Sequence, residues 1–339
     1  MERFRDNIPG KLTQDHPQAQ TEASVTDAST TRFGISFQSN KTIAEYRELA
    51  DVVARYRFAT CSVYQDLFYQ PPWPALLQFA ERTKTPLVGP AVVNPYLTHP
   101  VLVAGHLAVL DEISHGRAFL GVGRGAFFEP IGVPQPRPIR AMREMIDLVQ
   151  RLLTGDRTPF VGQCFRASEG AYLRGPIPGR RLPVMIGGWG EKTVRLAAEI
   201  ADMLKVGGLA NPAAVPDFKK RLAAAGRDVK LIFGAVTVID RDKRAAEELA
   251  RETLATYFPV IARLDPTYPL RDGERLPSDA LPSETLSRYC CFGTPKDVIR
   301  HMEKLFDAGV DVFELGTPHG TDEAEAIHLL GREVLPYFT

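Results

Sequence analysis

The stretch Ala118-Phe-Leu-Gly-Val-Gly-Arg-Gly-Ala126 decides the fold, together with Pro183-Val-Met-Ile-Gly-Gly-Trp-Gly-Glu-Lys-Thr193 further along the chain. Each is a short apolar run that breaks into glycines, and the second leads directly into a helical pattern. This layout is typical of a parallel strand that ends in an anion-binding loop, because glycines let the backbone approach a ligand and the next helix offers free N–H groups. Arg124 in the first loop is therefore a candidate for binding a cofactor phosphate, with a surface ion pair as the alternative.

Eight stretches of the chain have the apolar pattern of buried strands, and a helical pattern follows each of them. The strands are predicted at residues 32–38, 58–66, 86–93, 118–125, 183–187, 203–208, 230–238 and 312–316. Strands that alternate with helices pair in parallel, and eight such units predict a closed (β/α)8 barrel, the TIM-barrel fold. An open doubly wound sheet is the alternative, but the number of units and the length of 339 residues favour the barrel.

The domain organisation follows from composition. Residues 1–31 are polar and predict a disordered tail that takes no part in the chemistry. Residues 32–339 form the predicted barrel domain, and residues 242–290 are a helical, proline-rich insertion between the seventh and eighth strands. We interpret the insertion as a lid or substrate wall, with a dimer contact or an exposed elaboration as the alternatives.

Charge and composition narrow the class of function. Lys plus Arg and Asp plus Glu both number 41, so no charge excess favours binding to nucleic acid or to an anionic membrane. No apolar run approaches the length of a membrane-spanning helix, and there is no secretory signal. The four cysteines have neither a metal-ligand nor a disulfide spacing, and His99 and His106 lack a third ligand. We therefore expect a cytoplasmic protein with no metal site.

Functional side chains in a barrel follow the strands, because every strand's carboxyl end faces the same mouth. Asp66 ends the second strand, where its carboxylate can act on a substrate or hold a loop. Asn94 follows the third strand, and its amide can contact a cofactor ring or stabilise the turn. His319 follows the eighth strand and is a candidate for chemistry, with a role in the turn as the alternative. The residues alone leave these alternatives open.

Four stretches carry a resemblance to a known family: VGPAVVNPY at residues 88–96, AVLDEISHGR at 108–117 with AFLGVGRG directly after it, MIGGWG at 185–190 and FGTPKDV at 292–298. With them the chain resembles the bacterial-luciferase-like superfamily of flavin- and deazaflavin-dependent oxidoreductases. Within it, the chain is most similar to the methylenetetrahydromethanopterin reductase-like subgroup, which uses coenzyme F-420. The resemblance runs from about Arg32 to the C-terminus.

The resemblance implies a site for either F-420 or FMN. The cofactor ring would lie over the barrel mouth and its phosphate on the loops after strands four and five, where Arg124 matches a phosphate-binding arginine. A non-prolyl cis peptide bond at Ala91–Val92 would press against the ring, and Asn94 would lie beside it. The residues that match the second phosphate loop are Gly188, Trp189, Gly190 and Thr193.

The chain also departs from the family pattern. Many members have Asp-His at the end of strand two, whereas here Asp66 is followed by Leu67. Asp66 or His319 would have to replace the missing imidazole. Arg124 is more typical of members that bind FMN, while the overall likeness favours F-420, and the sequence does not separate the two.

The resulting hypothesis is an F-420-dependent oxidoreductase that transfers a hydride to or from a small organic substrate. The first alternative is an FMN-dependent monooxygenase that works with a partner flavin reductase. The second is a barrel of the same family that binds a flavin-like ligand without catalysis. By resemblance to its relatives the protein is expected to be a homodimer.

Overall fold

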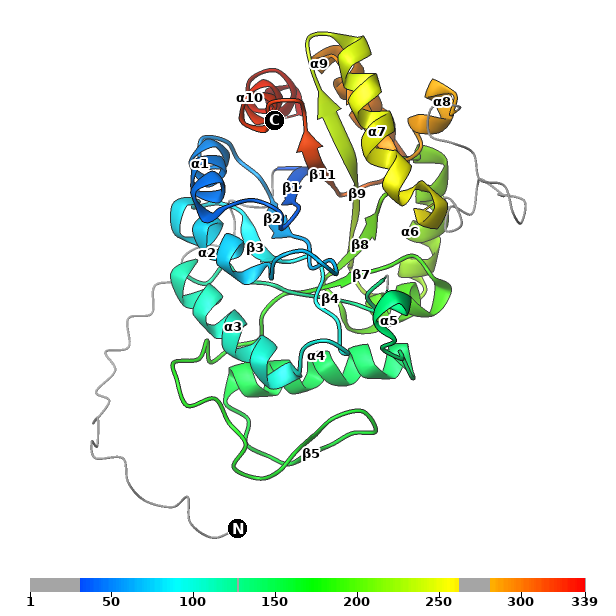
Figure 1. The fold of residues 1–339 in the computed structure, drawn as a ribbon. Coiled ribbons are helices and arrows are strands. Elements are labelled where there is room, and N and C mark those ends of the chain that lie inside the picture. Colours follow the sequence, from blue (N-terminus) through cyan, green and yellow to red (C-terminus); the bar gives the residue numbers. More distant parts are fainter. Residues whose placement is uncertain (1–30, 127, 262–280, 339) are drawn as a thin grey trace.

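The computed structural model describes residues 31–126, 128–261 and 281–338. Its centre is a ring of eight parallel strands (Figure 1): β1 (Phe33–Phe37), β2 (Thr60–Val63), β3 (Leu87–Pro90), β4 (Leu120–Gly123), β7 (Val184–Gly187), β8 (Met203–Gly207), β9 (Lys230–Ile239) and β11 (Val312–His319). They pair in the order β3-β2-β1-β11-β9-β8-β7-β4. Bridges between Val88 and Ala118 and between Val93 and Val122 join β3 to β4. The ring is therefore closed, and the prediction of a (β/α)8 barrel is confirmed.

A helix follows each barrel strand and packs on the outside of the ring (Figure 1). The helices are α1 (Ile43–Val53), α2 (Trp73–Arg82), α3 (Pro100–Ile113), α4 (Pro138–Thr154), α5 (Glu191–Ile200), α6 (Val215–Ala223), α7 (Lys243–Ile261), α9 (Pro295–Ala308) and α10 (Glu323–Leu329). A left-handed Gly155 ends α4, and Thr294 begins α9 with a capping box. None of the helices in the described ranges is long and apolar enough to cross a membrane.

The elements between the barrel units differ from the prediction in one place. A short hairpin of β5 (Phe160–Val161) and β6 (Arg166–Ala167) follows α4. After the short helix α8 (Ser283–Leu286), however, the chain forms a strand that the sequence did not predict, β10 (Cys290–Gly293), which pairs with the end of β9. An apolar run of four residues is too short to identify a strand by its period. The tail at residues 1–30 and the centre of the insertion, residues 262–280, lie outside the described ranges.

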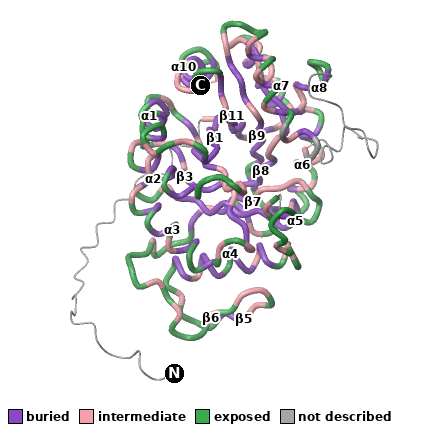
Figure 2. The backbone as a smooth tube through the Cα atoms, in the orientation of Figure 1, coloured by how far each residue is buried: buried purple, intermediate pink, exposed green. Residues whose placement is uncertain are grey.

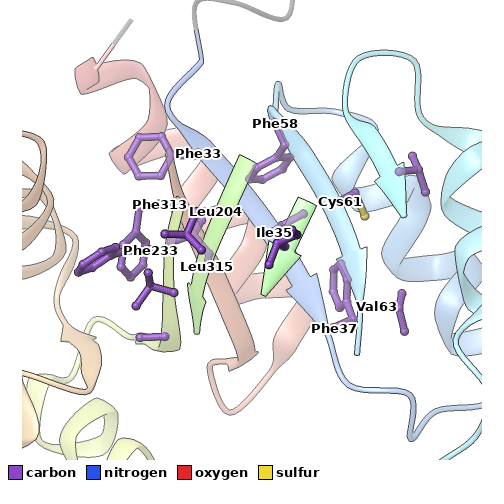
Figure 3. Packing of buried hydrophobic residues seen from close by; sticks show 14 of the residues in the cluster. Phe33, Ile35, Phe37, Phe58, Cys61, Val63, Leu204, Phe233, Phe313 and Leu315 are labelled. Carbon is purple, nitrogen blue, oxygen red and sulfur yellow. The ribbon is translucent and has the colours of Figure 1, made fainter. Parts of the chain in front are cut away.

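The strands alternate between two kinds of surface, as the pleat requires. The outward side chains, among them Phe33, Ile35 and Phe313, pack under the helices in the main hydrophobic core (Figure 3). Figure 2 shows the buried strands enclosed by helices whose outer faces are exposed. The inward side chains form a smaller apolar cluster of Phe119, Met185, Met203, Ile232 and Val312. Since these residues lie just before or within the first three residues of their strands, the cluster closes the barrel at the end opposite the mouth.

Arg117 ties the lower ends of several units together. Its guanidinium donates hydrogen bonds to the carbonyl oxygens of Ala80 (2.9 Å), Thr83 (2.7 Å), Pro86 (2.7 Å) and Ser114 (2.8 Å). These acceptors lie at the ends of α2 and α3 and just before β3. A planar guanidinium can serve several fixed acceptors at once, whereas a lysine ammonium cannot match this geometry. The arginine of the stretch at residues 108–117 therefore has a structural role.

We predict that Arg117→Lys lowers the free energy of unfolding by about 2–4 kcal/mol, because several carbonyl groups lose their donors. Urea unfolding followed by circular dichroism measures this change. The matched control is Arg47→Lys, since Arg47 donates to a single exposed acceptor, Gln78 Oε1, and should change stability by less than about 0.5 kcal/mol. Equal effects of the two substitutions would contradict the assigned role.

Candidate active site

The end of β3 projects into the barrel mouth. The Ala91–Val92 peptide bond is cis, as the resemblance implies. A Cβ atom at Gly123 would lie 2.5 Å from Val92 Cγ2, and one at Gly187 would lie 3.0 Å from Val92 Cγ1. The glycines that end β4 and β7 therefore provide the space for Val92. Ala91 and Val92 remain partly exposed at the centre of the mouth.

The loop after β4 carries an exposed cation. Arg124 is exposed, and no ion pair to it is found within the described ranges. Its carbonyl oxygen accepts a hydrogen bond from Gln135 Nε2 (2.8 Å), which holds the loop. The surface ion pair considered as the alternative role is therefore not seen, and the guanidinium is available to an anion.

The loop after β7 leads into the N-terminus of α5 beside this cation. Gly188 has φ +150°, and a Cβ there would lie 2.8 Å from Thr193 Cγ2, so only glycine fits. Gly190 caps α5 without a side chain, and a Cβ there would meet no atom within 4 Å. Trp189 packs against the core and is partly exposed. The open first turn of α5 and its N–H groups suit an anion such as phosphate.

Asn94 is buried, with 1% of its surface exposed. Its Oδ1 accepts hydrogen bonds from the backbone N–H groups of Tyr96 (3.1 Å) and Leu97 (3.0 Å). This arrangement is an Asx turn, which fixes the loop after β3. Of the two roles that the sequence left open for Asn94, its oxygen therefore has the role in the turn.

The other side of the mouth, above β1 and β2, is lined by hydroxyl, amide and carboxylate groups. Asp66 is partly exposed, and its Oδ2 accepts a hydrogen bond from Gln38 Nε2 (2.8 Å). Tyr257 of α7 is hydrogen-bonded to Gln38 and Tyr69. The insertion after β9 thus contributes a side chain to the mouth, and Asp66 lies where a ligand can reach it.

His319 is completely buried. Its Nδ1 lies 2.8 Å from Glu323 Oε1, and its Nε2 lies 3.2 Å from the carbonyl oxygen of Leu315. Both ring nitrogens are therefore occupied by partners within the fold. The structure corrects the interpretation of His319 as a group that exchanges protons at the mouth, and its role in the turn at the end of β11 replaces it.

Sequence reasoning missed two charged residues inside the barrel. Lys205 of β8 forms an ion pair with Glu314 of β11, and the two side chains are 7% and 0% exposed. Thr60 Oγ1 and Ser62 Oγ of β2 both donate to Glu314 Oε1 at 3.0 Å. The available signal was a charged residue at an inward position of an apolar strand, in MLKVG at residues 203–207 and VFELG at 312–316.

The barrel, the two glycine loops and the exposed arginine define a TIM-barrel protein whose mouth presents a cation and a helix N-terminus. Comparison with known proteins gives the family. The chain belongs to the luciferase-like monooxygenase family, whose model matches residues 16–312. The protein is accordingly an oxidoreductase of the luciferase-like class.

Two proteins of named activity and one solved structure are similar to this chain. The chain is 32% identical over 292 residues to a 5,10-methylenetetrahydromethanopterin reductase of Archaeoglobus fulgidus, which covers 76% of this chain and 84% of the relative. It is 27% identical over 280 residues to an F-420-dependent glucose-6-phosphate dehydrogenase of Nakamurella multipartita, covering 78% and 80%. The solved structure of the F-420-dependent tetrahydromethanopterin reductase of Methanopyrus kandleri has the same fold, with a TM-score of 0.78 at 24% identity over 91% of this chain and 99% of that one.

Proposed function

We propose that the protein transfers a hydride between coenzyme F-420 and a small organic substrate. The observation that carries the proposal is the mouth itself, where an exposed Arg124 and the open N-terminus of α5 flank the surface formed by Ala91 and Val92. The similar methanopterin reductase and glucose-6-phosphate dehydrogenase support this class of reaction. The substrates of those relatives are not transferred to this chain.

The residues at the mouth fit a flavin-type cofactor. Arg124 and the loop of Gly188, Trp189, Gly190 and Thr193 would hold the phosphate, because they combine a cation with the N-terminus of α5 and leave open space at Gly190. Ala91 and Val92 would support the ring, with Asn94 fixing the adjacent loop. When bound, the cofactor supplies the site for hydride transfer, and the protein supplies binding, orientation and exclusion of water.

Asp66 is our candidate for the side chain that handles the substrate proton. It lies at the mouth above β2, and its hydrogen bond from Gln38 fixes the carboxylate. A positioned carboxylate can accept or donate a proton during transfer of a hydride to or from carbon. His319 is not part of this proposal, because both of its ring nitrogens are occupied.

One observation favours FMN as the alternative cofactor. An arginine at position 124 resembles the phosphate ligand of FMN-binding members of the superfamily, and its exposed guanidinium suits a terminal phosphate. The protein would then be a monooxygenase supplied with reduced FMN by a partner reductase. A barrel that binds either cofactor without catalysis is the third possibility.

Titration of the purified protein with F-420 and with FMN, each oxidised and reduced, tests the proposal by fluorescence and absorbance. We expect F-420 to bind and to raise the unfolding temperature, since a ligand of the native state stabilises it. Binding of FMN alone would establish the alternative cofactor. Binding of neither would remove the enzyme assignment.

We predict that Arg124→Gln weakens binding of the cofactor by about 1–3 kcal/mol, because a charge-assisted hydrogen bond to phosphate is lost. Equilibrium titration measures the change. Arg227→Gln is the control, since Arg227 is exposed just before β9 and so lies at the opposite end of the barrel. Unchanged affinity in Arg124→Gln would show that this guanidinium does not bind the phosphate.

We predict that Asp66→Asn lowers turnover by about a hundredfold or more, because an amide cannot exchange the substrate proton. Cofactor affinity should change less than about threefold. Steady-state kinetics with a substrate found by screening alcohols, carbonyl compounds and imines provides the measurement. Asp228→Asn, at the exposed opposite end of the barrel, serves as the control. Full activity of Asp66→Asn would exclude this carboxylate from the chemistry.

We further propose that the protein is a homodimer in the cytoplasm. The outer face of α3 exposes Val101 (38%), Leu102 (60%) and Val109 (47%), and Leu97 just before the helix is 39% exposed. A helix that is apolar on both faces is normally covered, and a contiguous exposed patch suits a contact between protein molecules. All four cysteines are free thiols, which agrees with a reducing compartment.

The double substitution Leu102→Glu/Val109→Glu should convert the dimer to a monomer, because it places two charges in an apolar contact. Light scattering after size-exclusion chromatography gives the mass directly. Val161→Glu is the matched control, since Val161 is 79% exposed on β5 and is not part of α3. A dimer that persists in the double variant would place the contact elsewhere.

A further inference from the structure

The interior of the barrel has two layers of different character. Above the apolar cluster that closes the lower end, the next inward positions are occupied by Thr60, Ser62, Lys205 and Glu314. Barrel interiors are usually filled with branched apolar side chains. A polar layer directly beneath the mouth is therefore a departure that calls for a physical reason.

Glycines make room for the ion pair. A Cβ at Gly34 would lie 2.1 Å from Thr60 Oγ1 and 3.1 Å from Glu314 Cγ. A Cβ at Gly234 would lie 3.4 Å from Glu314 Cβ and 3.5 Å from Lys205 Cε. The strands β1 and β9 thus lack side chains at the height where the two charged groups meet.

The ion pair lies next to inward side chains of β2. The carboxylate of Glu314 is held by Thr60 and Ser62, which are inward residues of β2, and the next inward position towards the mouth is Tyr64. Lys205 Nζ lies 5.0 Å from the centroid of the Tyr64 ring. The ammonium therefore lies next to the Tyr64 ring, and aromatic rings attract cations.

Tyr64 connects this pair to the proposed ring site. Val63 is paired with Pro90 in the parallel register of β2 and β3, so Tyr64 lies beside Ala91 of the cis bond. Its hydroxyl lies 2.5 Å from Ser36 Oγ, and Ser36 donates to the carbonyl oxygen of Leu315. Tyr64 is thus held across the barrel, partly exposed to the mouth on top and next to the ammonium below.

Stability alone does not account for a buried ion pair. Removing two charges from water costs several kcal/mol per ion, and replacing such a pair by apolar groups is often neutral or stabilising. A pair that points its positive end at a ligand, however, acts on the charge of that ligand in a medium of low dielectric constant. A cofactor ring gains electron density on reduction, so a nearby cation favours its reduced form.

We propose that the Lys205–Glu314 pair, acting through the Tyr64 ring, makes the mouth bind the reduced cofactor more tightly than the oxidised one. Lys205, Glu314 and Tyr64 are then positioning residues that set the redox preference of the site. This inference rests on the proposed function, because it requires a redox cofactor at the mouth. This electrostatic preference for the reduced cofactor does not depend on a histidine directly after Asp66, which many family members have at the matching position and this chain lacks.

The test compares dissociation constants for the oxidised and the reduced cofactor in wild-type protein and in Lys205→Met/Glu314→Gln. The double variant removes both charges and keeps a side-chain oxygen at position 314 for Thr60 and Ser62 to donate to. We expect the ratio of the oxidised to the reduced dissociation constant to fall about tenfold, equivalent to about 30 mV for a two-electron couple. Thermal unfolding verifies that the variant is folded.

A second double variant and a control variant complete the experiment. Lys205→Gln/Glu314→Gln also removes both charges and lets the two amides bond to each other, so it provides a folded variant if the methionine does not pack. Lys219→Met/Asp311→Asn removes an ion pair of 2.5 Å whose carboxylate lies just before β11, at the lower end. It should leave the ratio unchanged.

The outcomes separate the two proposals. If wild-type protein binds neither F-420 nor FMN, the proposed function fails and no redox preference exists to explain. If wild-type protein binds one of them and the charge-free variants keep the same ratio, the inference is overturned while the proposed function stands. A change in melting temperature without a change in ratio would show that the pair is only structural.

Discussion

The close approach of β3 and β4 is the constraint on which the rest of the barrel depends. A Cβ at Gly89 would lie 2.4 Å from the carbonyl oxygen of Phe119, and one at Gly121 would lie 1.9 Å from that of Pro90. Any side chain at either position would hold the two strands apart and leave the ring open. The same contact brings Val92 over the glycines that end β4 and β7. Closure of the barrel and the shape of its mouth therefore have one physical origin.

Much of this architecture could be predicted from the sequence because it repeats. Eight alternations of strand and helix identify the barrel even where single boundaries are uncertain. The glycine loops could also be predicted, because an apolar strand that ends in glycines before a helix is typical of an anion-binding loop. The cis bond at Ala91–Val92 came from the resemblance and not from any local signal.

Other features could not be predicted because they depend on contacts between distant segments. The position of His319 at the end of β11 suggests a side chain at the mouth, but its Nδ1 bonds to Glu323 four residues later and the ring is buried. The four residues of β10 become a strand only because β9 extends beyond the ring. Lys205 and Glu314 are 109 positions apart, and neither residue alone indicates that its partner faces it. The alternation of inward and outward side chains along each strand places both residues inside the barrel. Their contact follows only from the arrangement of β8 and β11 in the ring.

The lower and upper layers of the barrel interior have different roles. The apolar cluster at the lower end and the Arg117 contacts hold the ring where no ligand reaches. Towards the mouth the inward positions become polar or carry no side chain. Layers nearer the mouth therefore contribute less to apolar packing and more to the charge and polarity of the site. The proposed phosphate loops would hold the phosphate of either F-420 or FMN. Discrimination between redox forms requires charge near the ring, and within the described ranges the buried cation that lies closest to that position is Lys205. Under the proposal, part of the chemistry of the mouth is set from below, by residues that do not touch the substrate.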